Sequence, residues 1–164
     1  MGAGRAINPF YHTGVADLLV LYYSAGGSVR RMAELVAEGI ERAPGAAARL
    51  RTVPGMSSHE KSVPSAGPPY CELGDLEECA GLALGSPTRF GNMAAPLKAF
   101  WDGTGLLWQR GTLAELNATR TGGTPYGASH FAGMGDDQPI SDAERALCVA
   151  QGKRLAEIAL QLAK

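Results

Sequence analysis

A turn of small and polar residues, Ser24–Ser28, carries the clearest chemical signal in the chain. It follows the continuous apolar run Leu18–Tyr23, and a helical pattern of apolar residues three or four apart begins at Val29. Backbone N–H groups at a helix N-terminus are unpaired, and the helix dipole favours negative charge there. Two glycines and two hydroxyls let the backbone approach an anion and add donors. The segment predicts an anion site, where a phosphate would offset the repulsion between the dipole and Arg30 and Arg31 in the first turn.

The same turn has a plainer interpretation. It could be a Gly-rich connection in which Ser28 is an ordinary N-cap. The chain contains neither the GxxxxGK[ST] phosphate loop nor the GxGxxG dinucleotide motif. From the residues alone, both interpretations stay open.

Composition narrows the class of protein. The chain has 164 residues and a net charge of −1, which gives no basic surface for nucleic acid. No apolar run approaches the roughly 20 residues of a membrane span. Residues 1–14 lack the apolar core of a signal peptide, so we expect a flexible leader or tag remnant followed by one domain over 15–164.

The cysteines and histidines predict no metal site. The three cysteines, Cys71, Cys79 and Cys148, have no CxxC or other metal-ligand spacing, and the three histidines are equally scattered. An odd and scattered set of thiols is typical of a reducing compartment. We therefore expect buried cysteines in a cytoplasmic protein.

Strand and helix patterns alternate, which predicts an α/β fold with a parallel sheet. We expect strands at Leu18–Tyr23, Ala48–Val53 and Gly81–Ser86, with the first in the centre and the second at an edge. Ligands of such sheets bind beyond the carboxyl ends of the strands, where Ser24–Ser28 and Ser86–Gly91 both lie.

Four helices are expected along the chain. They are Val29–Arg42, a short helix at Asp75–Cys79, a helix capped by Asn92 with Pro96 in its first turn, and Ser141–Ala163. The last begins with the capping box Ser-Asp-Ala-Glu. The first and last helices should pack on one face, because right-handed crossovers on opposite sides of the central strand bring them together.

Four segments together resemble one protein family. They are LVLYYSAGGSV at Leu19–Val29, GSPTRFGNM at Gly85–Met93, GLLW ending at Trp108, and GGTPYGASHFAG at Gly122–Gly133. They are similar to the WrbA-type NAD(P)H:quinone oxidoreductases, flavodoxin-like FMN proteins that are usually tetrameric. The resemblance implies a three-layer sandwich with strand order 2-1-3-4-5. It also implies two-electron transfer from NADH or NADPH to quinones through FMN.

The resemblance also implies roles for individual residues. The loop that holds the FMN phosphate corresponds to Ser24, Ala25, Gly26, Gly27, Ser28 and Val29, and the loop that contacts the flavin ring corresponds to Thr88, Arg89 and Phe90. Trp108 matches a tryptophan that lines the substrate side of the pocket, and Gly26 stands where the family often has an aromatic that contacts the nicotinamide cofactor.

Residue chemistry agrees with these roles and leaves alternatives. Arg89 is a candidate cation for the negative charge of reduced flavin, or it is a surface arginine. Phe90 and Trp108 could wall a flat aromatic pocket, or they belong to the core. Hydride transfer to flavin requires no acid or base, so we name no catalytic residue.

The sequence departs from the family after Leu116. Strand four, the Ser/Thr/Gly loop that cradles the flavin ring edge, a helix and most of strand five are missing, about 40 residues at usual element lengths. Either the protein lacks this block, or the sequence closes up a longer chain. We favour the second, since removing strand four would expose an apolar edge of strand three. Two consecutive residues between Leu113 and Gly122 should then not be bonded.

Three functions therefore compete. The first is an FMN-dependent quinone reductase, and the second is a flavodoxin-type FMN electron carrier. The second is disfavoured because flavodoxins are usually strongly acidic. The third is a non-catalytic, truncated assembly subunit, which the missing block keeps open.

Overall fold

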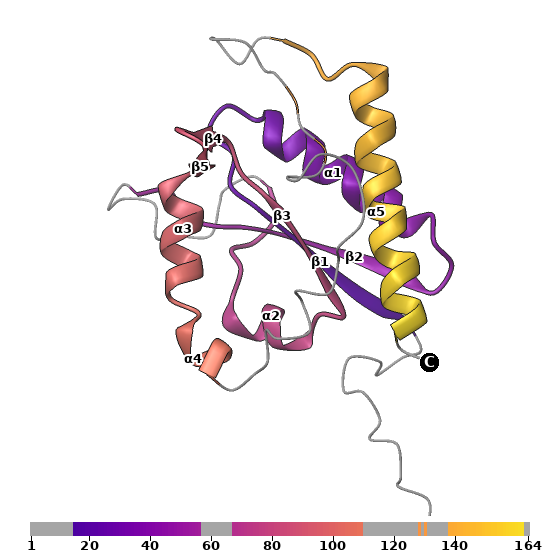
Figure 1. Cartoon of the computed structure of the whole chain (residues 1–164), viewed down its shortest axis with the longest axis horizontal. Helices are drawn as coiled ribbons and strands as arrows, with labels where there is room; N and C mark the ends of the chain where they lie inside the picture. Colours follow the sequence, from indigo (N-terminus) through magenta and orange to yellow (C-terminus); the bar gives the residue numbers. More distant parts are fainter. Residues whose placement is uncertain (1–14, 57–66, 110–127, 129, 131–137, 163–164) are drawn as a thin grey trace, which may run out of the picture.

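The computed structural model of the chain describes residues 15–56, 67–109, 128, 130 and 138–162. The expected leader, residues 1–14, lies outside them. Three parallel strands form the main sheet in the order β2-β1-β3 (Figure 1). They are β1 (Ala16–Tyr22), β2 (Ala46–Thr52) and β3 (Gly81–Gly85). The expected strands, their central and edge positions and their parallel direction are confirmed.

The strand β1 is buried on both sides because its apolar run serves two cores. Leu18, Val20 and Tyr22 point into one core, and Leu19 and Leu21 point into the other. Each of these side chains is at most 3% exposed. A continuous apolar run is the pattern that a strand covered by helices on both faces requires.

Helices cover the two faces of the sheet and complete three layers (Figure 1). The helices α1 (Ser28–Glu41) and α5 (Asp142–Leu162) pack on one face, as expected. On the other side lie α2 (Leu73–Glu78), α3 (Ala95–Asp102) and α4 (Gly105–Gln109). The capping box at the start of α5 is present, with the Ser141 N–H donating to Glu144 Oε2 at 2.8 Å.

The prediction that Asn92 caps a helix is wrong. Asn92 lies in β5 (Asn92–Met93), which pairs antiparallel with β4 (Thr88–Arg89), and α3 begins only at Ala95 with Ala94 as its N-cap. Phe90 and Gly91, with φ of 51° and 78°, form the two-residue turn of this hairpin. Turns with two positive φ angles match the right-handed twist of paired strands, which favours a hairpin here. The hairpin occupies Asn92 and Met93, so the helix begins later in the sequence, at Ala95. Pro96 does lie in the first turn of α3, as expected.

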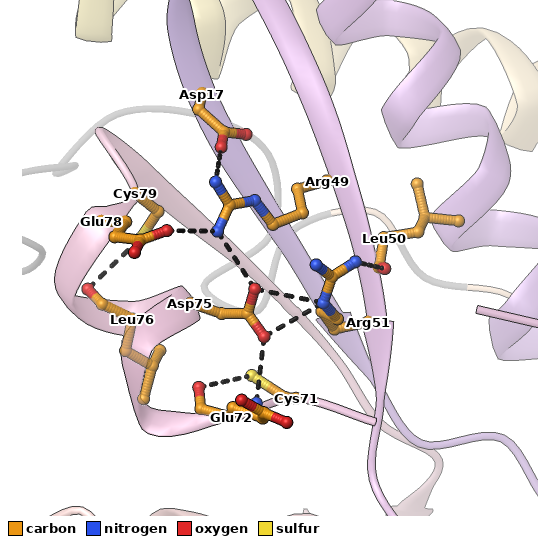
Figure 2. A network of polar contacts seen from close by, with 10 residues as sticks. All are labelled: Asp17, Arg49, Leu50, Arg51, Cys71, Glu72, Asp75, Leu76, Glu78 and Cys79. Atoms are coloured by element: carbon orange, nitrogen blue, oxygen red, sulfur yellow. Dashed lines mark hydrogen bonds and ion pairs between the residues drawn. The ribbon is translucent and has the colours of Figure 1, made fainter. Parts of the chain in front are cut away.

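Side chains alternate between the two faces of β2, so Arg49 and Arg51 share one face. On that face they form an ion-pair cluster with residues of α2 (Figure 2). Arg49 contacts Asp17 of β1 and, at 3.1 Å each, Asp75 and Glu78 of α2. Arg51 Nε lies 3.0 Å from Asp75 Oδ2. The cluster therefore ties both strands to α2.

Asp75 is the buried centre of this cluster. Burial by itself raises the pKa of Asp75, but three hydrogen-bond donors outweigh it and hold that pKa below its ordinary value. They are the Glu72 backbone N–H and the guanidinium groups of Arg51 and Arg49.

The helices α1 and α5 approach each other through glycines. A Cβ on Gly39 would lie 2.0 Å from the Val149 carbonyl oxygen, and a Cβ on Gly152 would lie 2.0 Å from the Val36 carbonyl oxygen. Such distances do not occur between real atoms, so both positions require the absence of a side chain. The two glycines set how closely α5 can pack.

Replacing Gly152 tests this close approach. Gly152→Ala should lower the free energy of unfolding by about 3 kcal/mol, because the methyl group forces the helices apart. Gly74→Ala in α2 is the matched control. Nothing lies within 4 Å of its Cβ position, so it should raise stability by about 0.5–1 kcal/mol. Urea denaturation measures both, and a Gly152→Ala variant as stable as wild type would contradict the packing.

Replacing Asp75 tests the ion-pair cluster. At neutral pH, Asp75→Asn should lower the free energy of unfolding by about 3 kcal/mol, since Arg49 and Arg51 lose their shared partner. The carboxylate contribution is present above the ordinary pKa of 3.8 and is lost as the pH falls through the lowered folded-state pKa. The difference from wild type should therefore shrink below about pH 4. Glu78→Gln is the control. Its side chain is exposed, so it should cost under about 0.5 kcal/mol. A difference that persisted unchanged into acid would contradict the assignment.

Candidate functional site

The turn between β1 and α1 has the shape of an anion cradle. Ser24 Oγ accepts a hydrogen bond from the Gly27 N–H at 3.0 Å, and Gly27 has a φ of 102°. The helix begins at Ser28, and its N-cap is Gly27 with no side-chain capping bond. The expectation that Ser28 is the N-cap is therefore wrong, whereas the choice between a plain Gly-rich connection and a phosphate site stays a prediction. Gly27 can adopt the left-handed conformation, so the turn closes one residue earlier and brings backbone N–H groups to the helix start.

Arg31 folds back over this helix start. Its Nη2 donates to Ser28 Oγ at 2.8 Å, and its Nη1 lies 3.2 Å from the place that a Cβ on Gly27 would occupy. Arg30 instead pairs with Glu34 at 2.9 Å. Within the described ranges, Arg31 forms no ion pair with a carboxylate. An anion bound here would offset the repulsion between this cation and the positive end of the helix dipole.

The end of β3 lies directly beside this turn. The Tyr23 N–H donates to the Gly85 carbonyl at 2.9 Å. A Cβ on Gly85 would be 3.1 Å from Val29 Cγ1, so the start of α1 and the end of β3 are in contact. The structure therefore brings together the two loops that the sequence placed at the carboxyl edge of the sheet.

The second loop projects from this edge as the β4–β5 hairpin (Figure 1). Thr88, Arg89 and Phe90 are all exposed, and Phe90 at the turn is fully so. A hollow of about 530 Å³ opens beside the hairpin, with Arg89 and Lys98 in its lining. Phe90 is absent from the described lining, so it walls no pocket there.

Arg89 is free to act on a ligand. Its Nη1 donates to the Thr88 carbonyl at 3.0 Å, and no carboxylate among the described residues pairs with it. The described lining of the hollow also includes Tyr23 and Met93, and it contains no acidic residue. The hollow thus combines aromatic and apolar surface with positive charge.

The remaining expected site residues are placed only in part. Trp108 belongs to α4, and its side chain lies outside the described part of the chain. Of the segment Gly122–Gly133, only Ala128 and His130 are described. The His130 side chain is buried, with Nδ1 3.0 Å from Glu144 Oε1 and Nε2 3.2 Å from the Gln138 carbonyl oxygen. Backbone and side-chain bonds from Ser141, and the bond from His130, lower the pKa of Glu144 to about 2.

The sequence analysis missed the anchoring role of His130. A single histidine carries no spacing signal, and its partner Glu144 already had a role as a capping residue.

The three cysteines are free and buried, as expected. Burial raises the pKa of Cys79 to about 11 and that of Cys71 to about 12, so both thiols remain protonated at neutral pH. Protonated, buried thiols are poor nucleophiles. Among the described residues, no group of three metal-ligating side chains is found, and no helix is long and apolar enough to cross a membrane.

The arrangement defines a flavodoxin-like protein: a three-layer α/β sandwich with a Gly/Ser turn and a helix N-terminus after its first strand. Solved structures agree on this fold. A WrbA-like flavodoxin from Agrobacterium tumefaciens matches with a TM-score of 0.56 at 18% identity, over 89% of this chain and 98% of that chain. An archaeal flavodoxin matches with the same TM-score and identity.

Sequence relatives identify the family. The NAD(P)H dehydrogenase (quinone) of Geotalea uraniireducens is 31% identical over 201 aligned positions, which cover 90% of this chain and 99% of the relative. That of Geobacter sulfurreducens is 32% identical over 89% of this chain and 98% of the relative. No model of a protein family matches. The chain belongs to the NAD(P)H dehydrogenase (quinone) family, which confirms the resemblance.

The alignment length agrees with the expectation that positions of the family are missing from this chain. Ninety per cent of 164 residues is about 148, so roughly 50 of the 201 aligned positions have no counterpart in this chain. The expected junction between Leu113 and Gly122 falls in residues 110–127, outside the described residues, so the expected break between bonded neighbours stays a prediction.

Proposed function

We propose that this chain is an FMN-dependent oxidoreductase that transfers two electrons from NADH or NADPH to a quinone. The observation that carries the proposal is the cradle after β1, where Ser24, Gly27 and Ser28 surround a helix N-terminus and Arg31 lies above it. A phosphate dianion needs several donors, and this cradle offers backbone N–H groups, two hydroxyls and a guanidinium without an acidic partner. The printed names of the relatives support the same activity.

The residues present fit FMN at its phosphate end. When bound, FMN supplies the group that accepts a hydride from the nicotinamide and passes electrons to the quinone. The cradle binds and orients the phosphate, and the hairpin after β3 brings Thr88, Arg89 and Phe90 to the edge of the sheet where the ring would extend. The Arg89 guanidinium has no competing carboxylate in the described structure, so it can stabilise negative charge on a ligand beside it. We place Trp108 on the substrate side.

A non-catalytic assembly subunit remains a second candidate because of one observation. The block that is missing relative to the family would supply the loop at the flavin ring edge, and roughly 50 aligned positions are without counterpart. We also propose a homo-oligomer, a tetramer by resemblance to the family, in the cytoplasm. The three free, buried thiols support a reducing compartment.

Two measurements on the purified protein separate these functions. After incubation with FMN and gel filtration, the protein should retain the visible absorption of a bound flavin and should oxidise NADH or NADPH with benzoquinone as acceptor. A protein that retains flavin without turning over the nicotinamide would be an electron carrier. A protein that retains no flavin would be the assembly subunit.

Variants of the cradle test the phosphate assignment. Ser24→Ala and Arg31→Met should each weaken FMN binding about tenfold to a hundredfold, since a charge-assisted hydrogen bond contributes roughly 1.5–3 kcal/mol. Gly27→Asp should weaken binding further, because it adds like charge and a Cβ at a φ of 102°. Arg30→Met is the matched control. Arg30 already pairs with Glu34, so this variant should bind FMN like wild type.

Flavin fluorescence quenching on titration with apoprotein measures these affinities at fixed ionic strength. Riboflavin lacks the phosphate, so it should bind wild type weakly and should respond little to Ser24→Ala. Equal FMN affinity of wild type, Ser24→Ala and Gly27→Asp would overturn the phosphate assignment.

A further inference from the structure

The hairpin that carries Thr88, Arg89 and Phe90 is short and meets solvent at its tip. Its ladder consists of two residue pairs, Thr88 with Met93 and Arg89 with Asn92 (Figure 1). Phe90 in the turn is fully exposed, so no packing of its side chain fixes the direction of the hairpin. A two-stranded hairpin is marginally stable by itself. The direction of the tip is therefore set at the base of the hairpin, where the chain leaves β3 and enters α3.

The ladder cannot continue in the ordinary way at this base. Bonded and non-bonded pairs alternate along an antiparallel ladder, and a bonded pair closes a tight turn. Thr88 and Met93 then form the non-bonded pair, which agrees with the Met93 N–H donating to Asn92 Oδ1 at 2.8 Å. The next bonded pair would be Pro87 with Ala94. Proline has no N–H, so these two residues cannot exchange both bonds.

The hydroxyl of Ser86 bridges the two residues instead. The Ala94 N–H donates to Ser86 Oγ at 2.8 Å, and Ser86 Oγ donates to the Pro87 carbonyl at 3.0 Å. One hydroxyl thus accepts from one side of the hairpin and donates to the other. Ala94 is 3% exposed, and a buried N–H requires an acceptor. Ser86 therefore closes the base of the hairpin.

This bridge also joins the hairpin to the elements beside it. Ser86 directly follows β3, and Ala94 is the N-cap of α3, whose carbonyl accepts the N–H groups of Leu97 and Lys98. The hydroxyl thus connects the end of a sheet strand to the start of a helix, with the hairpin between them. Arg89 on the hairpin and Lys98 on α3 line the same hollow. The separation of these two cations therefore depends on the bridge.

We propose that Ser86 is a positioning residue for flavin binding. Its hydroxyl holds the hairpin in the orientation in which Thr88, Arg89 and Phe90 meet the flavin ring, so it acts through those residues. Without the hydroxyl, the hairpin turns about its base and presents them to the ring for only part of the time. This inference rests on the proposed function, which brings the ring to this hairpin.

The bridge should affect the ring end of the flavin and leave the phosphate end unchanged. Ser86 acts on the loop after β3, whereas Ser24 belongs to the cradle after β1. FMN and riboflavin share the ring, so loss of the Ser86 hydroxyl should weaken both by the same factor. Loss of the Ser24 hydroxyl should weaken FMN alone. The two serines therefore have different signatures.

A matched pair of variants isolates the hydroxyl. Ser86→Thr and Ser86→Val have side chains of the same shape, and only threonine keeps the hydroxyl. Ser86→Thr should bind both flavins like wild type. Ser86→Val should bind both about tenfold more weakly, since a site that is correctly formed about a tenth of the time loses affinity by that factor. Ser86→Ala removes the hydroxyl without adding a methyl group, and it should behave like Ser86→Val.

Flavin fluorescence quenching measures these affinities under conditions in which urea denaturation shows each variant to be folded. A loss of stability alone would leave the riboflavin affinity of the folded protein unchanged. Equal riboflavin affinity of Ser86→Thr and Ser86→Val would overturn the positioning role, and so would a loss confined to FMN. A Ser86→Thr variant as weak as Ser86→Val would also overturn it. A wild type that binds neither flavin would overturn the proposed function and, with it, this role.

Amide hydrogen exchange of the apoprotein tests the bridge without flavin. The Ala94 amide should be protected in wild type and in Ser86→Thr, and it should exchange faster in Ser86→Val and Ser86→Ala. An Ala94 amide that exchanges at the same rate in all four proteins would overturn the bridge.

Discussion

The burial of β1 on both faces is the constraint on which the rest of this structure depends. A strand with apolar side chains on each face is stable only when helices cover both, and α1 and α5 on one side and α2 and α3 on the other provide that cover. The glycines that let α5 approach α1, Gly39 and Gly152, serve this burial directly. On the opposite face, the cluster around Asp75 holds α2 against the strands.

The proposed site depends on where β1 ends. The chain must leave the buried core at Tyr22 and turn into α1, and Gly27 makes that turn possible in a left-handed conformation. The turn leaves backbone N–H groups and the Arg31 guanidinium at one point of the sheet edge. Because β3 is parallel to β1, its own exit loop opens at the same edge, and Arg89 reaches it from the hairpin. The topology of a parallel sheet thus gathers both loops at the edge where ligands of such sheets bind.

The missing block separates this chain from its relatives in structure and in proposed chemistry. By resemblance to the family, the missing positions would include strand four and the loop expected at the flavin ring edge. The proposed phosphate cradle directly follows the central strand β1 and contains no residue of the missing block. The phosphate end of the expected cofactor site is therefore independent of the missing block, whereas the flavin ring end depends on it.

The sequence by itself determined the local elements and the family. The apolar run of β1, the Gly/Ser turn, the capping box of α5 and the order of the strands all follow from patterns within single segments. Only the tertiary structure decided what depends on partners far apart in the chain. It showed the Arg31 guanidinium folded back onto Ser28 without a carboxylate partner among the described residues, the pairing of His130 with Glu144 and the gathering of two arginines around Asp75. It also replaced the expected Asn92 cap with a hairpin, since a turn with two positive φ angles competes with helix initiation at that position. Local patterns predict secondary structure. The role of a charged side chain depends on which residues from distant parts of the chain folding brings beside it.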